Sequence, residues 1–320
     1  MEIVTCTDKW CVMPTGVMMT SVCVNNPDVE IVFHLIHDDS VSERDRNDLT
    51  ETVTRFDGKS IVFHEVDLTR FPCLPTITVG MAITQASYYR LLMPEILPTI
   101  PKVLYLDSDI IVRHSLLPLW NTDLTDMAVG VVPDGLEGRA DFYERLQYPR
   151  QLGYFNAGVI LVNLDYWRQH DAVSRFMGFL QHHAQNLLFA DQDILNVTFK
   201  DCKTFLPLTY NLTTGYLWEE PQYDYAKYVE EVLKVRKDPA VVHFAGNHPW
   251  IAYNRQPVHP FASSFFKYQN MTKWKGTKID KRPWKKRVVN FFGDLLRQIG
   301  LKAEMTVAYK YIDIAPVDNC

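Results

Sequence analysis

Short apolar segments alternate with longer amphipathic segments through the first two-thirds of the chain. The short segments are rich in Val, Ile, Leu and Phe, which predicts buried strands, and the longer ones have the spacing of helices. Ser40 and Glu43 fit a capping box that opens the second of these helices. The expected strands are residues 2–6, 29–36, 61–66, 102–106, 128–132 and 157–164, and the expected helices are 14–26, 40–56, 83–97 and 167–184. This order predicts an α/β fold with a mostly parallel, helix-covered sheet.

Beyond about residue 200 the pattern is less regular, and no internal repeat or low-complexity linker divides the chain. We therefore expect one domain, 1–266, followed by a tail, 267–320. Residues 267–302 hold 11 Lys and Arg against Asp280 and Asp294, a balance of +9. Apolar residues recur at roughly helical spacing after Trp284, so the tail is expected to form a basic amphipathic helix that binds an anionic membrane surface. The alternatives are a helix packed on the acidic domain and a solvated tail.

Composition places few limits on function. The 320 residues are 47% hydrophobic and 22% charged, as is ordinary for a soluble globular protein, and the net charge is a mild −5. The six cysteines form no CxxC pair, the N-terminal segment is too short and acidic for a signal peptide, and no apolar run approaches about 18 residues. We expect a cytoplasmic protein with no nucleic-acid partner.

Two carboxylates follow the expected strand 102–106. Asp107 and Asp109 are two residues apart, so on a continuing strand both side chains would project to the same side. In open α/β sheets ligands bind at the carboxyl ends of the strands, and oxygen ligands at this spacing suit Mg²⁺ or Mn²⁺, which in turn suits a diphosphate. A plain strand-end turn is the alternative, since Asp is common in turns.

Other polar residues fall at similar positions, each with a structural alternative. Asp8 follows the first strand, where it could contact a nucleotide or cap a turn. Arg90 lies on an otherwise apolar helix, where it could neutralise the carboxylates, hold a phosphate or reach the surface. Later segments add candidates at strand or helix ends, with turns, caps and structural histidines as the alternatives: Asn156, Gly158, Asp191, Gln192, Asp193, His243, Gly246 and His248.

Taken in order, these segments resemble glycosyltransferase family eight, in particular its bacterial lipopolysaccharide galactosyl- and glucosyltransferases. The resemblance runs over about the first 250 residues, through EIVTCTD, YYRLL, KVLYLDSDIIV, YFNAGVILVNLDYWR, DQDILN and HFAG to PW. It implies a GT-A fold that binds a nucleotide-sugar. It also implies a metal, Mn²⁺ with Mg²⁺ as the alternative, between Asp107, Asp109 and His243, where it would bridge the donor diphosphate.

The resemblance assigns further roles to residues of this chain. Gln192 would lie at the face of the anomeric carbon, with Asp191 beside it, and Asp134 would lie near the sugar and the acceptor. The nucleotide and sugar of the donor would be held by Cys6, Asp8, Arg90, Ser108, Asn156, Asp191, Gly246 and His248.

Two departures from the family pattern concern the donor site. Lys9 and Trp10 stand where family members often carry Asp-Asn, and the closing motif is one residue shorter. In that motif His248 precedes the proline in place of a lysine that would hold the diphosphate. An imidazole replaces that charge only when it is protonated.

The sequence therefore predicts a retaining, metal-dependent transferase that moves galactose or glucose from UDP to a saccharide or glycolipid acceptor in cell-surface glycan synthesis, peripheral on the inner face of the membrane. Three alternatives stay open at this point. One is a nucleotide-sugar-binding protein with impaired catalysis, one is a phosphatase of the haloacid-dehalogenase class, and one is a self-glucosylating primer of the glycogenin kind.

Overall fold

The computed structural model of the chain describes residues 1–67, 77–78, 81–82, 85–135, 140–218, 228–252 and 258–280. Most of the expected basic tail, residues 281–320, therefore lies outside the described residues, and so does its expected amphipathic helix. No helix among the described residues combines the length and the apolar character needed to span a bilayer.

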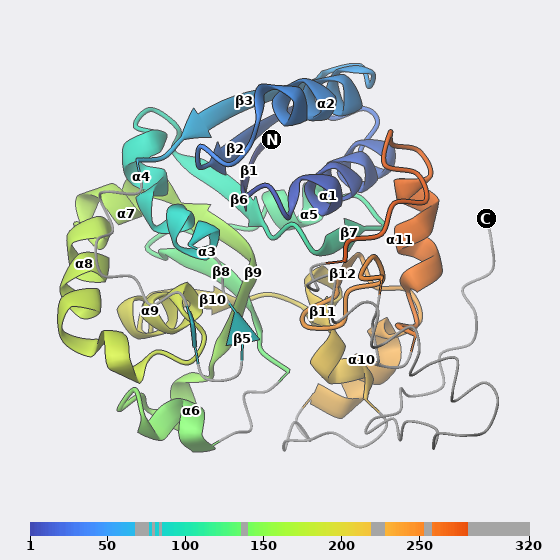
Figure 1. The fold of residues 1–320 in the computed structure, drawn as a ribbon. Helices are drawn as coiled ribbons and strands as arrows, with labels where there is room; N and C mark the ends of the chain where they lie inside the picture. Colours follow the sequence, from blue (N-terminus) through green and yellow to red (C-terminus); the bar gives the residue numbers. More distant parts are fainter. Residues whose placement is uncertain are drawn as a thin grey trace, which may run out of the picture.

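A seven-stranded sheet forms the centre of the molecule, in the order β10-β8-β9-β6-β1-β2-β3 (Figure 1). Only the pairs of β9 with β6 and with β8 are antiparallel, so the sheet is mostly parallel, as predicted. A three-stranded sheet β11-β12-β7 and a short hairpin β4-β5 complete the described strands. Their bounds are β1 Glu2–Thr7, β2 Ile31–His37, β3 Lys59–Glu65, β4 Ile77–Thr78, β5 Met81–Ala82, β6 Lys102–Leu106, β7 Ile110–Val112, β8 Val129–Pro133, β9 Phe155–Asn163, β10 Lys203–Phe205, β11 Leu212–Thr213 and β12 Val241–His243.

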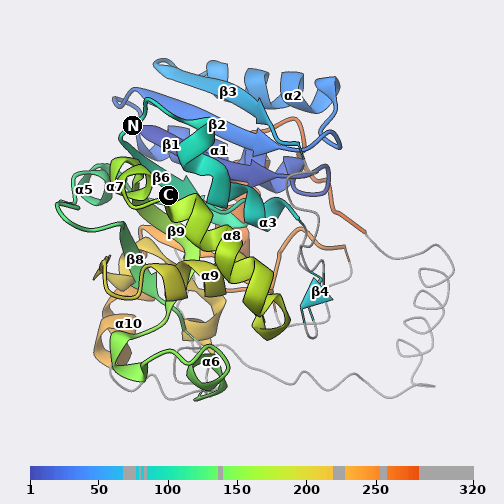
Figure 2. The ribbon, with the colours of Figure 1, turned by 90° about the vertical axis from the view of Figure 1, so that its left-hand side faces the viewer.

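Helices cover both faces of the large sheet, which gives three layers (Figure 2). The α-helices are α1 Val12–Asn25, α2 Glu43–Thr54, α3 Ala86–Tyr89, α4 Met93–Ile96, α5 Leu117–Trp120, α6 Ala140–Glu144, α7 Leu164–Gln169, α8 Ala172–His183, α9 Asp191–Thr198, α10 Val229–Val235 and α11 Ala262–Gln269. The short 3₁₀ helices are η2 Arg90–Leu92, η3 Arg150–Leu152, η4 Ala184–Asn186, η5 Leu208–Tyr210 and η6 Thr214–Leu217.

The sheet separates two hydrophobic cores. Successive side chains of a strand point to opposite faces, and in β6 Leu104 and Leu106 join one core while Val103 and Tyr105 join the other. The first core packs against α1, α2 and α11, and the second against α3, α4, α7, α8 and α9. Because β6 is buried on both faces, it reads in the sequence as an unbroken apolar run rather than an alternating one.

The predicted capping box was displaced by two residues. Helix α2 begins at Glu43, and its box is made by Ser42, whose hydroxyl accepts the Asp45 N–H, and by Asp45, whose carboxylate accepts the Ser42 N–H. Ser40 instead donates its hydroxyl hydrogen to Asp38 and accepts the backbone N–H of Lys9. The predicted positions were wrong because a Glu was expected as the third helical residue of the box. In the structure Asp45 is that residue.

Two expected helices are interrupted. The segment 83–97 forms α3, η2 and α4 in succession, and within 167–184 the chain passes from α7 to α8 through Asp171, whose φ is +48°. A non-glycine residue rarely takes this left-handed conformation, so a turn there is not expected from an amphipathic pattern. Both segments still place their apolar residues in the second core.

The segment around the expected boundary at residue 266 packs on the catalytic domain. Helix α11 runs through that boundary and lies beside α1 (Figure 1). Beyond it, the Trp274 ring lies against Gly16 of α1, and Lys273 Nζ is 2.6 Å from Asp48 Oδ1 of α2. Trp274 thus belongs to the expected tail by position, but its ring packs on a helix of the domain.

Candidate active site

Polar residues from five strands converge at one edge of the fold. The parallel strands β1, β6 and β8 end there, and each is followed by a carboxylate, namely Asp8, Asp107 and Asp134. Because β9 is antiparallel to its neighbours, its first residues lie at the same edge and present Asn156. The register of β8 and β9 shifts between Val131 and Val132, beside Asn156, and such irregularities re-aim side chains. His243 is the last residue of β12.

Two adjoining cavities, of about 440 and 330 Å³, open at this edge. Ser87, Arg90, Asp107, Asp109 and Gly246 line both. The larger cavity is also lined by Asp134, Asn156, Asp191, Gln192 and His243, and the smaller one by Cys6, Asp8, Ser108 and His248. The fold thus brings together every residue to which the resemblance assigned donor binding, metal binding or catalysis. The further candidate Asp193 is instead fully buried and forms an ion pair of 2.6 Å with Arg145.

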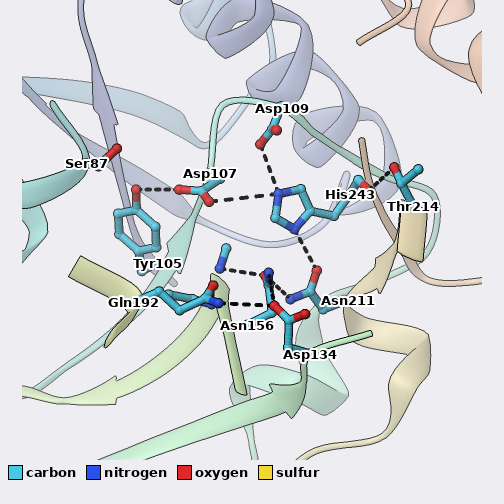
Figure 3. Close-up of polar contacts among 12 residues, drawn as sticks. Ser87, Tyr105, Asp107, Asp109, Asp134, Asn156, Gln192, Asn211, Thr214 and His243 are labelled. Atoms are coloured by element: carbon cyan, nitrogen blue, oxygen red, sulfur yellow. Dashed lines mark hydrogen bonds and ion pairs between the residues drawn. The ribbon is translucent and has the colours of Figure 1, made fainter. Parts of the chain in front are cut away.

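Asp107 and Asp109 lie in a turn between β6 and β7 rather than on a strand that continues through them. The chain leaves the large sheet after Leu106 and enters the three-stranded sheet at Ile110. The turn nevertheless directs both carboxylates toward His243, whose Nε2 is 3.1 Å from Asp109 Oδ1 and 3.9 Å from Asp107 Oδ2 (Figure 3). One potential ligand atom from each of the three residues lies within 4.8 Å of the other two. Two carboxylates and an imidazole suit a divalent ion such as Mn²⁺.

Arg90 neutralises part of this acidic cluster. Its guanidinium donates a hydrogen bond of 2.8 Å to Asp107 Oδ1, and the Tyr105 hydroxyl donates another of the same length. Arg90 Nε also lies 3.0 Å from Asp191 Oδ2, although its hydrogen bond goes to the Ser87 carbonyl, so this contact with Asp191 is an ion pair only. Arg90 is 4% exposed, which excludes the alternative of a surface arginine.

Burial and the neighbouring charges shift several pKa values in the site. Burial raises the pKa of Asp191 to about 7. The positive charge of Arg90 opposes this rise, and the like charge of Asp107 adds to it. Burial also disfavours ionisation of Asp109, but the facing His243 and His248 outweigh it and hold the pKa of Asp109 below its usual range. Conversely, burial favours neutral His243, but Asp109 and Asp107 outweigh it and raise the pKa of His243.

His248, in the wall of the smaller cavity, contacts one of the three candidate metal ligands. Its Nε2 lies 3.1 Å from Asp109 Oδ2, the carboxylate oxygen that does not face His243, and its ring stacks on Trp250 at 4.8 Å. The position that the family motif gives to a lysine is therefore filled here by an imidazole in contact with a candidate metal ligand.

The first strand contributes Cys6 and Asp8 to the smaller cavity. Asp8 Oδ1 accepts the backbone N–H groups of Trp10 at 2.8 Å and Cys11 at 3.2 Å, so this oxygen holds the turn that leads into α1. The structural alternative for Asp8, a capped turn, is thus present alongside its place in the cavity wall. Burial raises the pKa of Cys6 to about 12, which keeps the thiol neutral.

A chain of amide side chains links His243 to Asp134 (Figure 3). His243 Nδ1 lies 3.0 Å from Asn211 Oδ1, and Asn211 Nδ2 donates to Asn156 Oδ1 at 2.9 Å. Asn156 Nδ2 in turn donates to Asp134 Oδ2 at 3.0 Å, and Gln192 Nε2 donates to the same oxygen at 3.1 Å.

Asn211 was not identified as a site residue from the sequence. It comes directly before β11, which pairs with the strand that carries His243, but β11 and β12 are two and three residues long. Strands this short are difficult to identify from an apolar pattern. Sequence reasoning also missed other residues that line the larger cavity: Ser87, Phe189, Thr213, Thr214 and Trp218.

The α/β fold is that of the GT-A glycosyltransferases, as the comparisons with known proteins show. The sequence profile of glycosyl transferase family 8 matches residues 2–253, and the chain belongs to this family. General stress protein A of Bacillus subtilis (strain 168) is 27% identical over 279 residues, which cover 86% of this chain and 94% of that protein. The lipopolysaccharide 1,2-glucosyltransferase of Escherichia coli (strain K12) is 25% identical over 279 residues, covering 84% of this chain and 75% of that one.

Among solved structures, the galactosyltransferase LgtC in complex with donor and acceptor sugar analogs superposes with a TM-score of 0.73 at 28% identity. The match covers 90% of this chain and 99% of that one. The resemblance noted in the sequence is thereby confirmed for both the family and the fold, and the phosphatase alternative is excluded.

Proposed function

We propose that the protein is a retaining, metal-dependent hexosyltransferase that moves galactose or glucose from a UDP-sugar to a saccharide acceptor of a cell-surface glycan. The relatives support this proposal, because they include a lipopolysaccharide glucosyltransferase and a galactosyltransferase solved with donor and acceptor sugar analogs.

One observation carries the proposal: Asp107, Asp109 and His243 present three ligand atoms to one point between the two cavities. Asp8, Asp134 and Asp191 add further carboxylates to the cavity walls. An anionic diphosphate would be repelled from such a site unless a cation lay between it and the carboxylates. A divalent ion bound by Asp107, Asp109 and His243 would lie between these carboxylates and the diphosphate and would attract both.

We assign the two cavities to different parts of the donor. The smaller one, with Cys6, Asp8, Ser108 and His248 in its wall, would hold the nucleotide. The larger one would hold the hexose and the acceptor, beside Asp134, Asn156, Asp191 and Gln192. Gly246, which lines both and has a φ of +81°, would allow the backbone to approach the diphosphate between them.

In this arrangement the residues of the chain orient the sugar and stabilise the leaving group. Mn²⁺, or Mg²⁺, bound by Asp107, Asp109 and His243 would supply charge stabilisation for the departing UDP. Arg90 fixes Asp107 in place through its 2.8 Å hydrogen bond. Gln192 donates to Asp134 and accepts the Ala157 N–H, and these two hydrogen bonds would hold its amide beside the anomeric carbon. Since an amide is a poor nucleophile, we favour attack by the acceptor on the same face from which UDP leaves.

A screen of UDP-sugars tests the proposal. Each sugar is incubated with the full-length protein and Mn²⁺, UDP release is measured, and the anomer formed on a saccharide acceptor is determined by NMR. We expect release from UDP-galactose or UDP-glucose and an α-linked product, which is retention. UDP binding without release would favour the alternative of a binding protein with impaired catalysis, and a β-linked product would contradict retention.

We further propose that the enzyme works in the cytoplasm at the inner face of the membrane through its basic tail. The support is the charge pattern of the sequence, in which Lys285, Lys286 and Arg287 precede apolar residues at helical spacing. Each basic residue near an anionic surface contributes about 1 kcal/mol of attraction. Replacing these three residues by Glu should release the full-length protein from anionic vesicles at low salt and leave UDP release unchanged. A wild-type protein that ignores such vesicles would contradict the proposal.

A further inference from the structure

The amide chain between His243 and Asp134 has a fixed direction. Asn156 Oδ1 accepts the backbone N–H of Gly158 at 2.9 Å, while Asn156 Nδ2 faces the Asp134 carboxylate. Turning this amide over would oppose N–H to N–H at one end and oxygen to oxygen at the other. Asn156 therefore offers its oxygen to Asn211, and Asn211 must direct its own NH₂ group toward that oxygen.

The direction of Asn211 determines what His243 can do. With its NH₂ group held by Asn156, Asn211 can offer only its carbonyl oxygen to His243 Nδ1, 3.0 Å away. An oxygen at that position is satisfied only if Nδ1 carries a proton. The neutral ring then leaves Nε2 with a lone pair, and Nε2 is the atom that faces Asp107 and Asp109.

Without this constraint, the opposite tautomer would be favoured. Asp109 Oδ1 lies 3.1 Å from Nε2 and would attract a proton to it, which would leave no lone pair for a metal ion. Asn211 is fully buried and Asn156 is 8% exposed, so water does not compete for these contacts. The interaction is therefore stronger than the same hydrogen bond would be at the surface.

We propose that Asn211 is a positioning residue for the metal site, which keeps the proton of neutral His243 on Nδ1 so that Nε2 is free to bind the ion. This inference rests on the metal site of the proposed function. It adds a residue that touches neither the metal nor the substrate, and that couples the metal ligand to Asn156 and Asp134 in the sugar part of the site. Partners of a ligating imidazole commonly change metal affinity by about 10- to 100-fold when they are removed.

The test is a titration of the metal-free full-length protein with Mn²⁺. Binding is monitored through the EPR signal of free Mn²⁺, a measurement that requires no turnover. Asn211→Leu removes the acceptor with little change in volume and should weaken Mn²⁺ binding by about 10- to 100-fold. Asn211→Asp retains an oxygen toward Nδ1, whether or not the carboxyl group is ionised. It should keep at least about one-third of the wild-type affinity for Mn²⁺. Urea unfolding of the metal-free proteins shows whether each variant is folded.

The outcomes separate this inference from the proposed function. A wild-type protein that binds no Mn²⁺ would contradict the metal site itself. If the wild type binds but Asn211→Leu binds equally well, or if Asn211→Asp loses as much affinity as Asn211→Leu, the inference about Asn211 is overturned. Should Asn211→Leu not fold, ¹⁵N NMR of the wild type loaded with Cd²⁺ decides. A proton on Nδ1 of His243 supports the inference, and a proton on Nε2 overturns it.

Discussion

Gly158 leaves open the space that the imidazole of His243 occupies. A Cβ atom at position 158 would lie 2.2 Å from His243 Cε1 and 2.9 Å from Asp107 Oδ2. In the sequence this glycine was one of the candidates at a strand end, with a turn as the alternative. In the structure it allows two candidate metal ligands to approach each other, and its carbonyl accepts the Asp107 N–H at 2.8 Å.

Gly158→Ala should therefore disrupt the metal site. The added methyl group overlaps the His243 ring, which must leave its position beside Asp107 and Asp109, and overpacking of this kind costs about 1–3 kcal/mol of folding stability. We expect Mn²⁺ affinity, measured by calorimetry, to fall at least about tenfold. Gly178→Ala is the matched control. It lies in α8 with nothing within 4 Å of a new Cβ, so Mn²⁺ affinity should not change and stability should rise by about 0.5–1 kcal/mol. Equal effects of the two variants would contradict the assignment.

Gln192→Ala should lower turnover and spare nucleotide binding. Gln192 lines the larger cavity but not the smaller one, and its amide contacts Asp134 and Ala157. Removing it takes away a group expected near the anomeric carbon, which should slow UDP-sugar hydrolysis by about 10²-fold or more. Calorimetry with UDP and Mn²⁺ provides the independent measurement. A large loss of UDP affinity would place Gln192 in the nucleotide site instead.

Folding stability should decrease in mild acid because of His259. Burial and the nearby His248 lower the pKa of His259 to about 3. Its Nδ1 accepts the Phe261 N–H, so the neutral ring carries its proton on Nε2, toward Thr214 Oγ1. The unfolded chain takes up a proton near pH 6.5 and the folded protein does not. The contribution of neutral His259 to the free energy of unfolding is therefore complete above about pH 6.5. It decreases as the pH falls, and about 2 kcal/mol of it is lost at pH 5.

Urea unfolding at several pH values measures this decrease. In His259→Gln the side chain cannot titrate, and its NH₂ group can still reach Thr214, so the slope of stability between pH 6.5 and 5 should be reduced. An unchanged slope would show that other groups cause the acid sensitivity.

Gly16→Ala should loosen the segment that follows α11. The new methyl group would lie 2.3 Å from Trp274 Cζ3, so the indole must leave its position on α1. We expect a loss of about 1–3 kcal/mol in urea unfolding, together with a change in Trp fluorescence. The double variant Gly16→Ala/Trp274→Leu should recover part of that loss because the smaller side chain leaves room. If Gly16→Ala unfolds like the wild type, Trp274 does not pack where the structure places it.

The sequence predicted the parts of this protein that depend on local pattern. The strand 102–106 has the expected bounds because residues 103–106 are all apolar and Asp107 follows them directly. The predicted helix ends were less accurate. Ser42 and Asp45 form the capping box of α2, although Ser40 and Glu43 have residue types that are equally suited to one. Residue types alone did not distinguish these two pairs.

The parts that depend on long-range packing could not be predicted. Asp107 and Asp109 converge through a turn whose shape depends on β7 pairing with β12, about 130 residues later in the chain. Asn211 acquires its position only when β11 pairs with β12. Family resemblance compensated for this at His243 and Gln192, because their positions follow recognisable motifs, but it offered no such motif for Asn211.

The rate of UDP release from UDP-galactose and UDP-glucose, measured before and after removal of divalent metal, tests the central claim most directly. We predict that EDTA abolishes release and that Mn²⁺ restores it in the wild type. Asp109→Asn should stay at least about a hundredfold slower at saturating Mn²⁺ while remaining folded at the assay temperature, because a charged ligand to the catalytic ion is lost. Full activity in EDTA, or in Asp109→Asn, would contradict the claim that Asp107, Asp109 and His243 hold a catalytic metal.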